Sequence, residues 1–319
     1  MAGQQRVAMG RPAVASAAVG LGGLGACCYL AVLIGHAGAL LLVYLTQLPL
    51  FVAGLWLGTG AAALAGASGV VILLAASDPF GAAGFAALNA APVTLLVRQA
   101  LLARRREDGA LSWYPPGLLA AWLTALALAG MAAALLFYGG PHGLQATVRA
   151  LAVRSLEQLS RRPLPDRERV AGAVALIIPG MLAASWMVMA VVNGALAQGV
   201  LARFGANWRP SPSIAALGLP IWIPVALGLA AAATLFGGGP RFVGINVMIA
   251  LAVPFCLAGL AVVHAAARRL PNPAMALAAF YVMAALFGWP FLAVALLGLL
   301  ESWLGLRHRL APHGARIDG

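Results

Sequence analysis

The stretch Gly117–Tyr138 reads GLLAAWLTALALAGMAAALLFY and contains no charged side chain. About 20 apolar residues in a helix cross the roughly 30 Å hydrocarbon core of a bilayer, so this stretch is long enough to span a membrane. Comparable apolar segments lie before and after it: Ala13–Ile34, Gly38–Leu57, Thr59–Ser77, Phe80–Ala103, Val170–Gln198, Ile214–Phe236, Gly244–Ala266 and the longer Ala274–Leu304. The sequence therefore predicts an all-α membrane protein, a polytopic helix bundle of about 8–10 spans in one integral membrane domain.

The composition indicates that lipid, and not water, surrounds most of the side chains. Of the 319 residues, 63% are hydrophobic and 9% are charged, whereas about 25% of the residues in a typical soluble domain are charged. The net charge is +12, and all 20 basic residues are arginine, because the chain has no lysine. These arginines lie in short connections beside apolar segments, which is typical of a topology signal and argues against nucleic-acid binding.

The positions of the arginines predict a cytoplasmic N-terminal tail over residues 1–12. Arg6 and Arg11 precede the first segment and Arg104–Arg106 follow the fourth, so an even number of crossings separates two basic regions. Connections rich in Lys and Arg stay on the cytoplasmic side of a membrane. The same rule assigns to that side the connections that carry Arg203, Arg209, Arg268 and Arg269.

The connection over residues 139–169, between spans one to five (13–138) and the remaining spans (170–304), does not follow this rule. The count of crossings places it outside, although it carries several arginines. Its Leu144, Val148, Leu151 and Leu159 recur on one helical face, which predicts an amphipathic helix lying at the membrane interface. An earlier segment that re-enters on the same side is the alternative explanation.

The last apolar stretch, Ala274–Leu304, has two possible structures. A hairpin broken at Gly288-Trp289-Pro290 would keep the basic tail, residues 305–319, on the cytoplasmic side. Arms of about 14 residues rise only about 21 Å, which is short for a crossing, so a single kinked helix is the alternative. We favour the hairpin.

Uncharged polar residues within the spans are the candidate ligand contacts. Ionisable residues inside the spans are too few to form a proton or ion pathway. Amide and aromatic side chains near prolines offer donors and acceptors that could line a cavity, and we select Tyr44, Gln47, Asn89, Trp186 and Asn193. Hydrogen bonds and kinks between helices explain the same residues without any ligand.

The sequence contains no pattern that predicts an enzyme. Gly66-Ala67-Ser68-Gly69 resembles the nucleophile motif of an intramembrane serine protease, but only the distant His36 and His264 could serve as its base. The three cysteines, Cys27, Cys28 and Cys256, all lie in apolar segments. Leu24–Cys27 resembles a lipoprotein cleavage box, but we favour an uncleaved first helix, because the chain continues directly into further spans. We therefore expect no catalytic residue, no metal and no cofactor.

The C-terminal residues resemble a known family. Leu297–Trp303, with Arg307, is similar to the C-terminal signature of the YybS-like bacterial membrane proteins, which have no established function. The shared residues are Gly298, Glu301, Ser302, Trp303 and Arg307. Pro179 early in a span and Leu219–Trp222 before the next helix extend the likeness, whereas Gly305 stands where that family often has a second acidic residue.

The resemblance has consequences for fold and location. It implies a bacterial inner (cytoplasmic) membrane protein that is distantly similar to the substrate-binding subunits of energy-coupling-factor transporters, over the first six spans, and to MreD. We expect a small-molecule binding or transport protein whose ligand is unknown. The alternative is a non-enzymatic envelope scaffold that binds partner proteins or anionic lipids. Beyond the bilayer, a membrane protein partner or an oligomer is compatible with either hypothesis.

Overall fold

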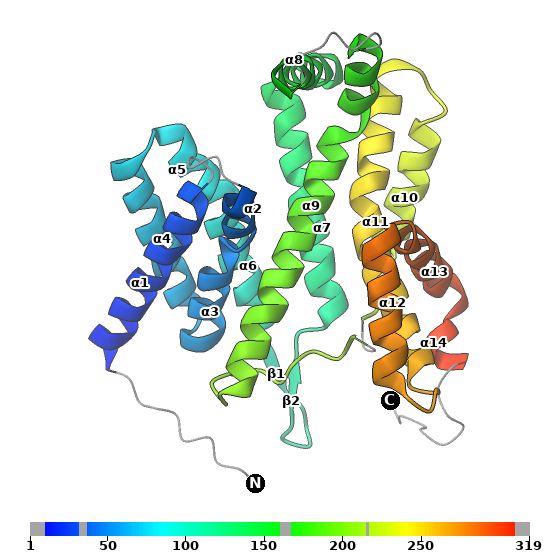
Figure 1. The fold of residues 1–319 in the computed structure, drawn as a ribbon. Helices are drawn as coiled ribbons and strands as arrows, with labels where there is room; N and C mark the ends of the chain where they lie inside the picture. The colour runs from blue at the N-terminus through cyan, green and yellow to red at the C-terminus, as the bar shows by residue number, and fades with distance from the viewer. Residues whose placement is uncertain (1–9, 32–36, 160–166, 215–216, 310–319) are drawn as a thin grey trace. The chain divides into compact units, whose positions relative to one another are not determined.

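The structure is a computed structural model that describes residues 10–31, 37–159, 167–214 and 217–309, and it is mainly helical (Figure 1). The chain forms two compact units: unit 1 comprises Met1–Tyr114 and Val188–Pro212, and unit 2 comprises Pro115–Met187 and Ser213–Gly319. The long helix α9 (Arg167–Arg203) contributes its beginning to unit 2 and its end to unit 1. Within the described ranges, seven helical segments are long and apolar enough to cross a membrane, which confirms an all-α polytopic protein.

Unit 1 consists of short and interrupted helices. Its elements are α1 (Arg11–Leu30), α2 (Ala37–Tyr44), α3 (Gln47–Leu57), α4 (Thr59–Ala76), α5 (Pro79–Phe85), the π-helix η2 (Ala86–Ala90), α6 (Ala91–Ala100), the strands β1 (Ala103–Arg105) and β2 (Leu111–Trp113), and the end of α9. Two predicted spans, Gly38–Leu57 and Phe80–Ala103, are therefore each built from more than one helix. Gly58 allows the turn between α3 and α4, because its φ of 101° suits glycine alone.

Small residues bring α1 and α4 together. Ala18 and Ala26 of α1 and Ala65 of α4 are completely buried. A Cβ built on Gly22 would overlap the Ala65 carbonyl oxygen, so the two helices approach each other at a distance that only glycine permits. Close approach at small residues is the usual basis of helix packing in lipid, where apolar side chains gain little by leaving the acyl chains.

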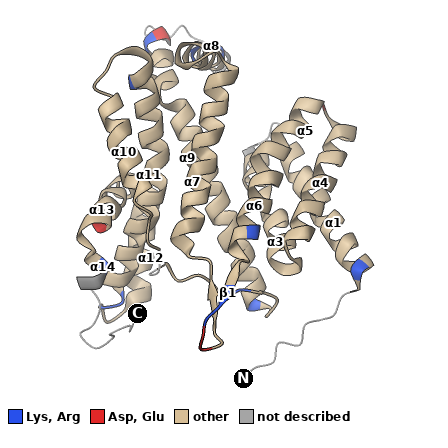
Figure 2. Ribbon diagram, turned by 180° about the vertical axis from the view of Figure 1, so that it is seen from behind, with Lys and Arg blue, Asp and Glu red and all other residues tan. Residues whose placement is uncertain are grey.

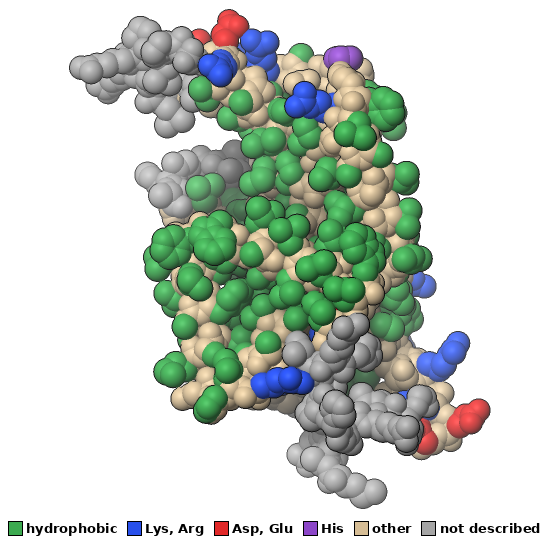
Figure 3. Space-filling view, turned by 90° about the vertical axis from the view of Figure 1, so that its right-hand side faces the viewer, with side chains coloured by type: hydrophobic (Ala, Val, Ile, Leu, Met, Phe, Trp, Pro, Cys, Tyr) green, Lys and Arg blue, Asp and Glu red, His purple; other side chains and the backbone are tan. Residues whose placement is uncertain are grey.

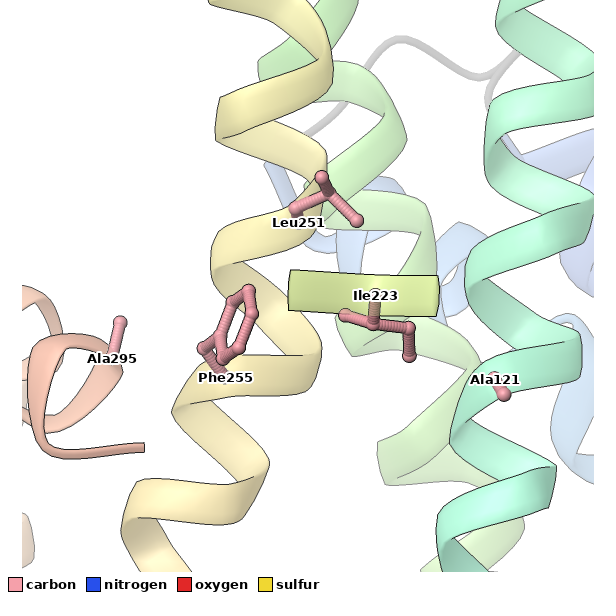
Figure 4. Packing of buried hydrophobic residues seen from close by; sticks show 5 residues of the cluster. All are labelled: Ala121, Ile223, Leu251, Phe255 and Ala295. Carbon is pink, nitrogen blue, oxygen red and sulfur yellow. The ribbon is translucent and has the colours of Figure 1, made fainter. Parts of the chain in front are cut away.

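Unit 2 is built around helix α11. Its elements are α7 (Pro116–Phe137), α8 (Pro141–Leu159), the beginning of α9, α10 (Trp222–Ala233), α11 (Gly238–Ala267), α12 (Pro273–Phe287), α13 (Pro290–Leu304) and α14 (Leu306–Arg309). Leu251 and Phe255 of α11 form the centre of its core, together with Ala121, Ile223 and Ala295 from α7, α10 and α13 (Figure 4).

Two glycines fix the contact between α11 and α13. A Cβ on Gly298 would overlap the Phe255 carbonyl oxygen, and a Cβ on Gly259 would overlap that of Val294. Each helix thus places a glycine against the backbone of the other. Gly259 lies four residues after Phe255 on α11, and Gly298 lies four residues after Val294 on α13. Gly298, one of the residues of the C-terminal signature, is therefore required by packing.

The seventh predicted span is shorter than the sequence predicts. We expected Ile214–Phe236, whereas the helix α10 covers only 12 residues, Trp222–Ala233. Pro220 explains the late start, because it lacks an N–H and forces the residue before it out of the helical conformation. At 1.5 Å per residue α10 is about 18 Å long, less than the roughly 30 Å of the hydrocarbon core.

The C-terminal apolar stretch breaks where the sequence predicts. Helices α12 and α13 meet at an angle of 118° around Gly288 and Trp289, and Gly288 has a positive φ of 69°. Each helix has 15 residues, and the pair forms either one broken span or a hairpin. The side of the membrane on which the chain ends stays a prediction.

The connection after α7 forms helix α8, which lies across the ends of α7 and α11 in Figure 1. Of the predicted apolar face, Leu144 is buried and Leu151 is exposed. Arg149 of α8 pairs with Glu168 of α9 at 2.9 Å. A location at the membrane interface stays a prediction.

The distribution of side chains agrees with a lipid environment. Charged residues are found at helix ends, in connections and along α8 (Figure 2). Hydrophobic side chains cover most of the side of unit 2 that Figure 3 presents, and large residues such as Leu229, Leu286 and Leu292 are more than half exposed. In water such a surface would cause aggregation, whereas acyl chains solvate it.

Candidate functional site

The most unusual part of unit 1 is a pair of interruptions in its helices. The first separates α2 from α3 at Leu45 and Thr46, and Pro49 explains it in part because proline cannot donate to the Leu45 carbonyl four residues earlier. The second is the π-helix η2, followed by Pro92, which likewise cannot donate to the Leu88 carbonyl. Such π-helical turns are frequent at functional sites.

Gln47 connects the two interruptions. Its side chain is completely buried at the beginning of α3, and its Nε2 donates a hydrogen bond to the Leu88 carbonyl of η2 at 3.1 Å. Because a carbonyl can only accept, this bond identifies the nitrogen of the amide and therefore also its oxygen. The Gln47 Oε1 is buried and has no hydrogen-bond partner within the chain.

Asn193 connects α9 to the first interruption. Its Nδ2 donates to the Tyr44 carbonyl at 2.6 Å and to the Met189 carbonyl at 2.7 Å. These two bonds use both amide protons and fix the orientation of the side chain. The Asn193 Oδ1 is buried without a partner in the chain, like that of Gln47.

Two further buried oxygens have no partner in the chain. They are the Oδ1 of Asn89, in η2 and one residue after Leu88, and the Oγ1 of Thr46, between α2 and α3. We call Thr46, Gln47, Asn89 and Asn193 the polar cluster. Each buried acceptor that stays unpaired costs about 1–3 kcal/mol. The polar cluster is therefore a costly arrangement for a purely structural role.

The structure brings together some of the sequence candidates. Gln47, Asn89 and Asn193 lie around the same helix interruptions, whereas Tyr44 contributes its backbone carbonyl and its side chain is 45% exposed. Trp186 belongs to the part of α9 that lies in unit 2. Thr46 is not among the ligand contacts predicted from the sequence, although Pro49, three residues later, indicates that the helix is interrupted there.

The buried amide of Asn246 in unit 2 has a different role. Its Oδ1 accepts from the Gly180 N–H at 2.6 Å, and its Nδ2 donates to the Leu176 and Phe242 carbonyls at 2.9 and 2.8 Å. All of its donors and its acceptor are thus used. Asn246 stabilises the turn of α9 that contains Pro179 and leaves no polar atom for a ligand.

The residues of the C-terminal signature form a helix-terminating structure. Glu301 is buried, and its Oε1 lies 2.6 Å from the Nε of Arg307. Its Oε2 accepts from the Arg307 backbone N–H at 3.1 Å. Gly305 between them is left-handed, with a φ of 56°, which ends α13 and turns the chain back toward Glu301. Ser302 donates to the Gly298 carbonyl, and Trp303 is exposed.

Arg209, in the connection between α9 and α10, is a buried arginine. Only 5% of it is exposed, and its guanidinium donates to the Ala100 carbonyl at 3.1 Å and to the Tyr114 carbonyl at 2.8 Å. Ala100 precedes β1 and Tyr114 follows β2, so Arg209 holds both ends of the β-hairpin. Burial lowers the pKa of this guanidinium from its ordinary value.

Ser68 lies in the contact between α1 and α4. Its hydroxyl donates to the Ala65 carbonyl at 3.0 Å and lies 3.4 Å from the Val19 carbonyl oxygen. Among the residues that the structure describes, no three His, Cys, Asp or Glu side chains are grouped as in a metal site.

A comparison with protein families matches residues 27–302 to a family described as predicted membrane protein, DUF2232. The chain belongs to the DUF2232 family. No curated protein and no solved structure matches it. The DUF2232 region contains the whole polar cluster and also Gly298, Glu301 and Ser302, whereas Trp303 and Arg307 lie beyond its end.

Proposed function

We propose that this membrane protein binds a small solute at the polar cluster of unit 1 and takes part in its transport. The observation that carries the proposal is the set of four buried oxygens that have no hydrogen-bond partner among the described residues. A solute that donates hydrogen bonds to them would recover the free energy that their burial costs. The interrupted helices are compatible with this function, because non-helical backbone at membrane depth is either buried in protein or lines a cavity.

The C-terminal residues resemble those of YybS-like proteins, which have no established function. We take the distant likeness that this resemblance implies to the substrate-binding subunits of energy-coupling-factor transporters as support for solute binding. We further propose that the protein resides in the bacterial inner membrane with its N-terminus in the cytoplasm, because the arginines beside the first and fourth spans favour that orientation. We also propose that it is not an enzyme, since the Ser68 hydroxyl is used in helix packing.

Ligand-induced stabilisation of the purified protein tests this function. A solute that binds only the folded protein raises its thermal midpoint. We expect at least one member of a broad panel of vitamins, nucleobases and small metabolites to do so, and we expect Asn193→Leu to abolish the effect. Asn272→Ala is the matched control, because Asn272 is exposed and its side chain does not cap α12. Stabilisation that persists in Asn193→Leu would contradict a site at the polar cluster.

The β-hairpin supports a second function, that of a scaffold. Arg104, Arg105 and Arg106 are exposed on it, and Arg209 holds its base. A fixed basic hairpin suits an acidic partner protein or anionic lipids. Replacing these three arginines with Gln should then remove a co-purifying partner or reduce binding of anionic lipid. Unchanged partners and unchanged lipid binding would exclude this function.

A further inference from the structure

We infer that the solute is an uncharged molecule that presents N–H groups to the polar cluster. This inference rests on the proposed function and concerns the chemistry of the ligand. Three of the four unpaired atoms are amide oxygens, which only accept hydrogen bonds. The fourth, the Thr46 hydroxyl, can accept as well as donate. A ligand that offered only acceptors, such as a carboxylate or a phosphate, would repel these oxygens.

The distribution of acidic residues argues against a cation. Unit 1 contains only three acidic residues, Asp78, Glu107 and Asp108. Asp78 caps α5 by accepting from the backbone N–H groups of Phe80 and Gly81, while Glu107 and Asp108 are exposed in the β-hairpin. No carboxylate in the described part of unit 1 therefore lies at the polar cluster to neutralise a buried positive charge, which lipid-enclosed sites normally require.

The distribution of arginines argues equally against an anion. Arg98 is exposed in the last turn of α6, more than two turns after Asn89. Arg209 is buried but directs its guanidinium to the Ala100 and Tyr114 carbonyls. Among the described residues of unit 1, the polar cluster therefore has acceptors without a compensating charge of either sign, and a neutral donor is the chemistry that matches it.

The neighbouring side chains favour a compact apolar body for this molecule. Leu50 and Phe51 lie one turn after Gln47 and are nearly completely buried. Phe51 also contacts α9 beside Asn193, because a Cβ on Gly194 would lie 3.6 Å from its ring. Cyclic ureas, lactams and aromatic amides combine an apolar ring with N–H donors, and they form the class that we propose.

Matched pairs of probes test the inference on the unaltered protein. We would measure thermal stabilisation of the purified chain by uracil, nicotinamide and 2-imidazolidinone, each beside its N-methylated counterpart. The two members of a pair share the ring and the carbonyl groups, and differ in that methyl groups replace the N–H hydrogens. We expect at least one N–H probe to stabilise the protein and its N-methylated form to bind at least about tenfold more weakly, because buried acceptors reject a ligand that leaves them unpaired.

Variants locate the effect at the polar cluster. Gln47→Leu and Asn193→Leu should each weaken binding of the N–H probe at least about tenfold, whereas Asn272→Ala should leave it unchanged. If the leucine variants do not fold, equilibrium dialysis of the probe pairs against the unaltered protein supplies the decisive comparison.

Three results would overturn the inference. Equal binding of the N–H and N-methylated probes would exclude recognition by donors. Stabilisation that depends on the polar cluster and is caused by orotate, the carboxylate derivative of uracil, or by sodium ions alone would refute the inference that the ligand is a neutral donor. The proposal that unit 1 binds a solute would still stand. If neither these probes nor the broad panel stabilises the protein, both the inference and the proposed function fail.

Discussion

The side chain of Asn246 bonds to the backbone of Gly180 across two helices, with 2.6 Å between its Oδ1 and the Gly180 nitrogen. The same amide donates to the Leu176 carbonyl, the helical acceptor one turn before Gly180. It therefore reinforces α9 at the turn that contains Pro179, where the helix lacks one of its own N–H donors. Gly180 is needed for this contact, because a Cβ there would lie 2.7 Å from the Asn246 carbonyl oxygen.

Replacing Asn246 with leucine should destabilise unit 2. The change removes three hydrogen bonds and leaves the Gly180 N–H and two carbonyls with fewer partners in an apolar interior. We expect a loss of about 1–3 kcal/mol in the free energy of unfolding, measured by unfolding of the purified protein in a mild detergent. Asn272→Ala should have no measurable effect, and a stability of Asn246→Leu equal to that control would refute the bridging role.

Gly298→Ala should separate α13 from α11. The added methyl group would overlap the Phe255 carbonyl oxygen, and backbone cannot move as easily as a side chain, so we expect a loss of about 1–3 kcal/mol. Gly228→Ala is the matched control, since it also lies in a helix of unit 2 but has no atom within 4 Å of the built Cβ. That variant should be neutral or slightly stabilising, and equal melting of both variants would argue against the contact.

Glu301→Gln should weaken the end of α13. The substitution removes the charge that pairs with Arg307 while preserving the shape of the side chain, and Glu301 is buried. We expect a loss of about 1–3 kcal/mol, together with faster hydrogen exchange at Arg307, whose N–H bonds to the Glu301 carboxylate. A double-mutant cycle with Arg307→Gln measures the pair itself, and a coupling energy near zero would show that the contact does not contribute.

Arg209→Gln should loosen the β-hairpin without unfolding the spans. The shorter, neutral side chain cannot bond to both the Ala100 and the Tyr114 carbonyls. We expect proteolysis and hydrogen exchange over residues 103–113 to increase several-fold, since local opening would cost about 1–3 kcal/mol less. Arg203→Gln, at the exposed end of α9, serves as the control. Unchanged protection of the hairpin would contradict the role assigned to Arg209.

Ser68→Ala should preserve any activity or cellular phenotype of the protein. The Ser68 hydroxyl bonds to a carbonyl of its own helix, so its loss should change the stability by no more than about 1 kcal/mol. Growth of a strain that carries the variant, compared with a strain lacking the protein, provides the measurement. Loss of function in a stable, normally inserted Ser68→Ala protein would revive the protease hypothesis.

The sequence predicts the spans well because their signal is local. Uncharged stretches such as Gly117–Tyr138 require no tertiary information, and the corresponding helix, Pro116–Phe137, differs by one residue at each end. The break at Gly288-Trp289-Pro290 is equally local. The length of α10 was predicted wrongly, because the apolar character of Ile214–Phe236 continues through Pro220 and hides the point at which the helix begins.

The candidate site could be predicted only in part. Buried amides within a span were recognised as candidates, but Asn246 and Asn193 look alike in the sequence and differ only in their partners. The free oxygen of Asn193 depends on the Tyr44 carbonyl, far away in the chain. The π-helix over Ala86–Ala90 also gave no periodic signal. Such properties arise from contacts between helices, which hydrophobicity does not encode.

The shortness of α10 has a consequence for the surrounding membrane. Its Val225 and Leu229 are more than half exposed, and as a lipid-facing span α10 would be about 12 Å shorter than the hydrocarbon core. Lipid compensates for such a mismatch by local thinning, at a cost that falls when the acyl chains are shorter. The stability of unit 2 should therefore depend on the thickness of the bilayer.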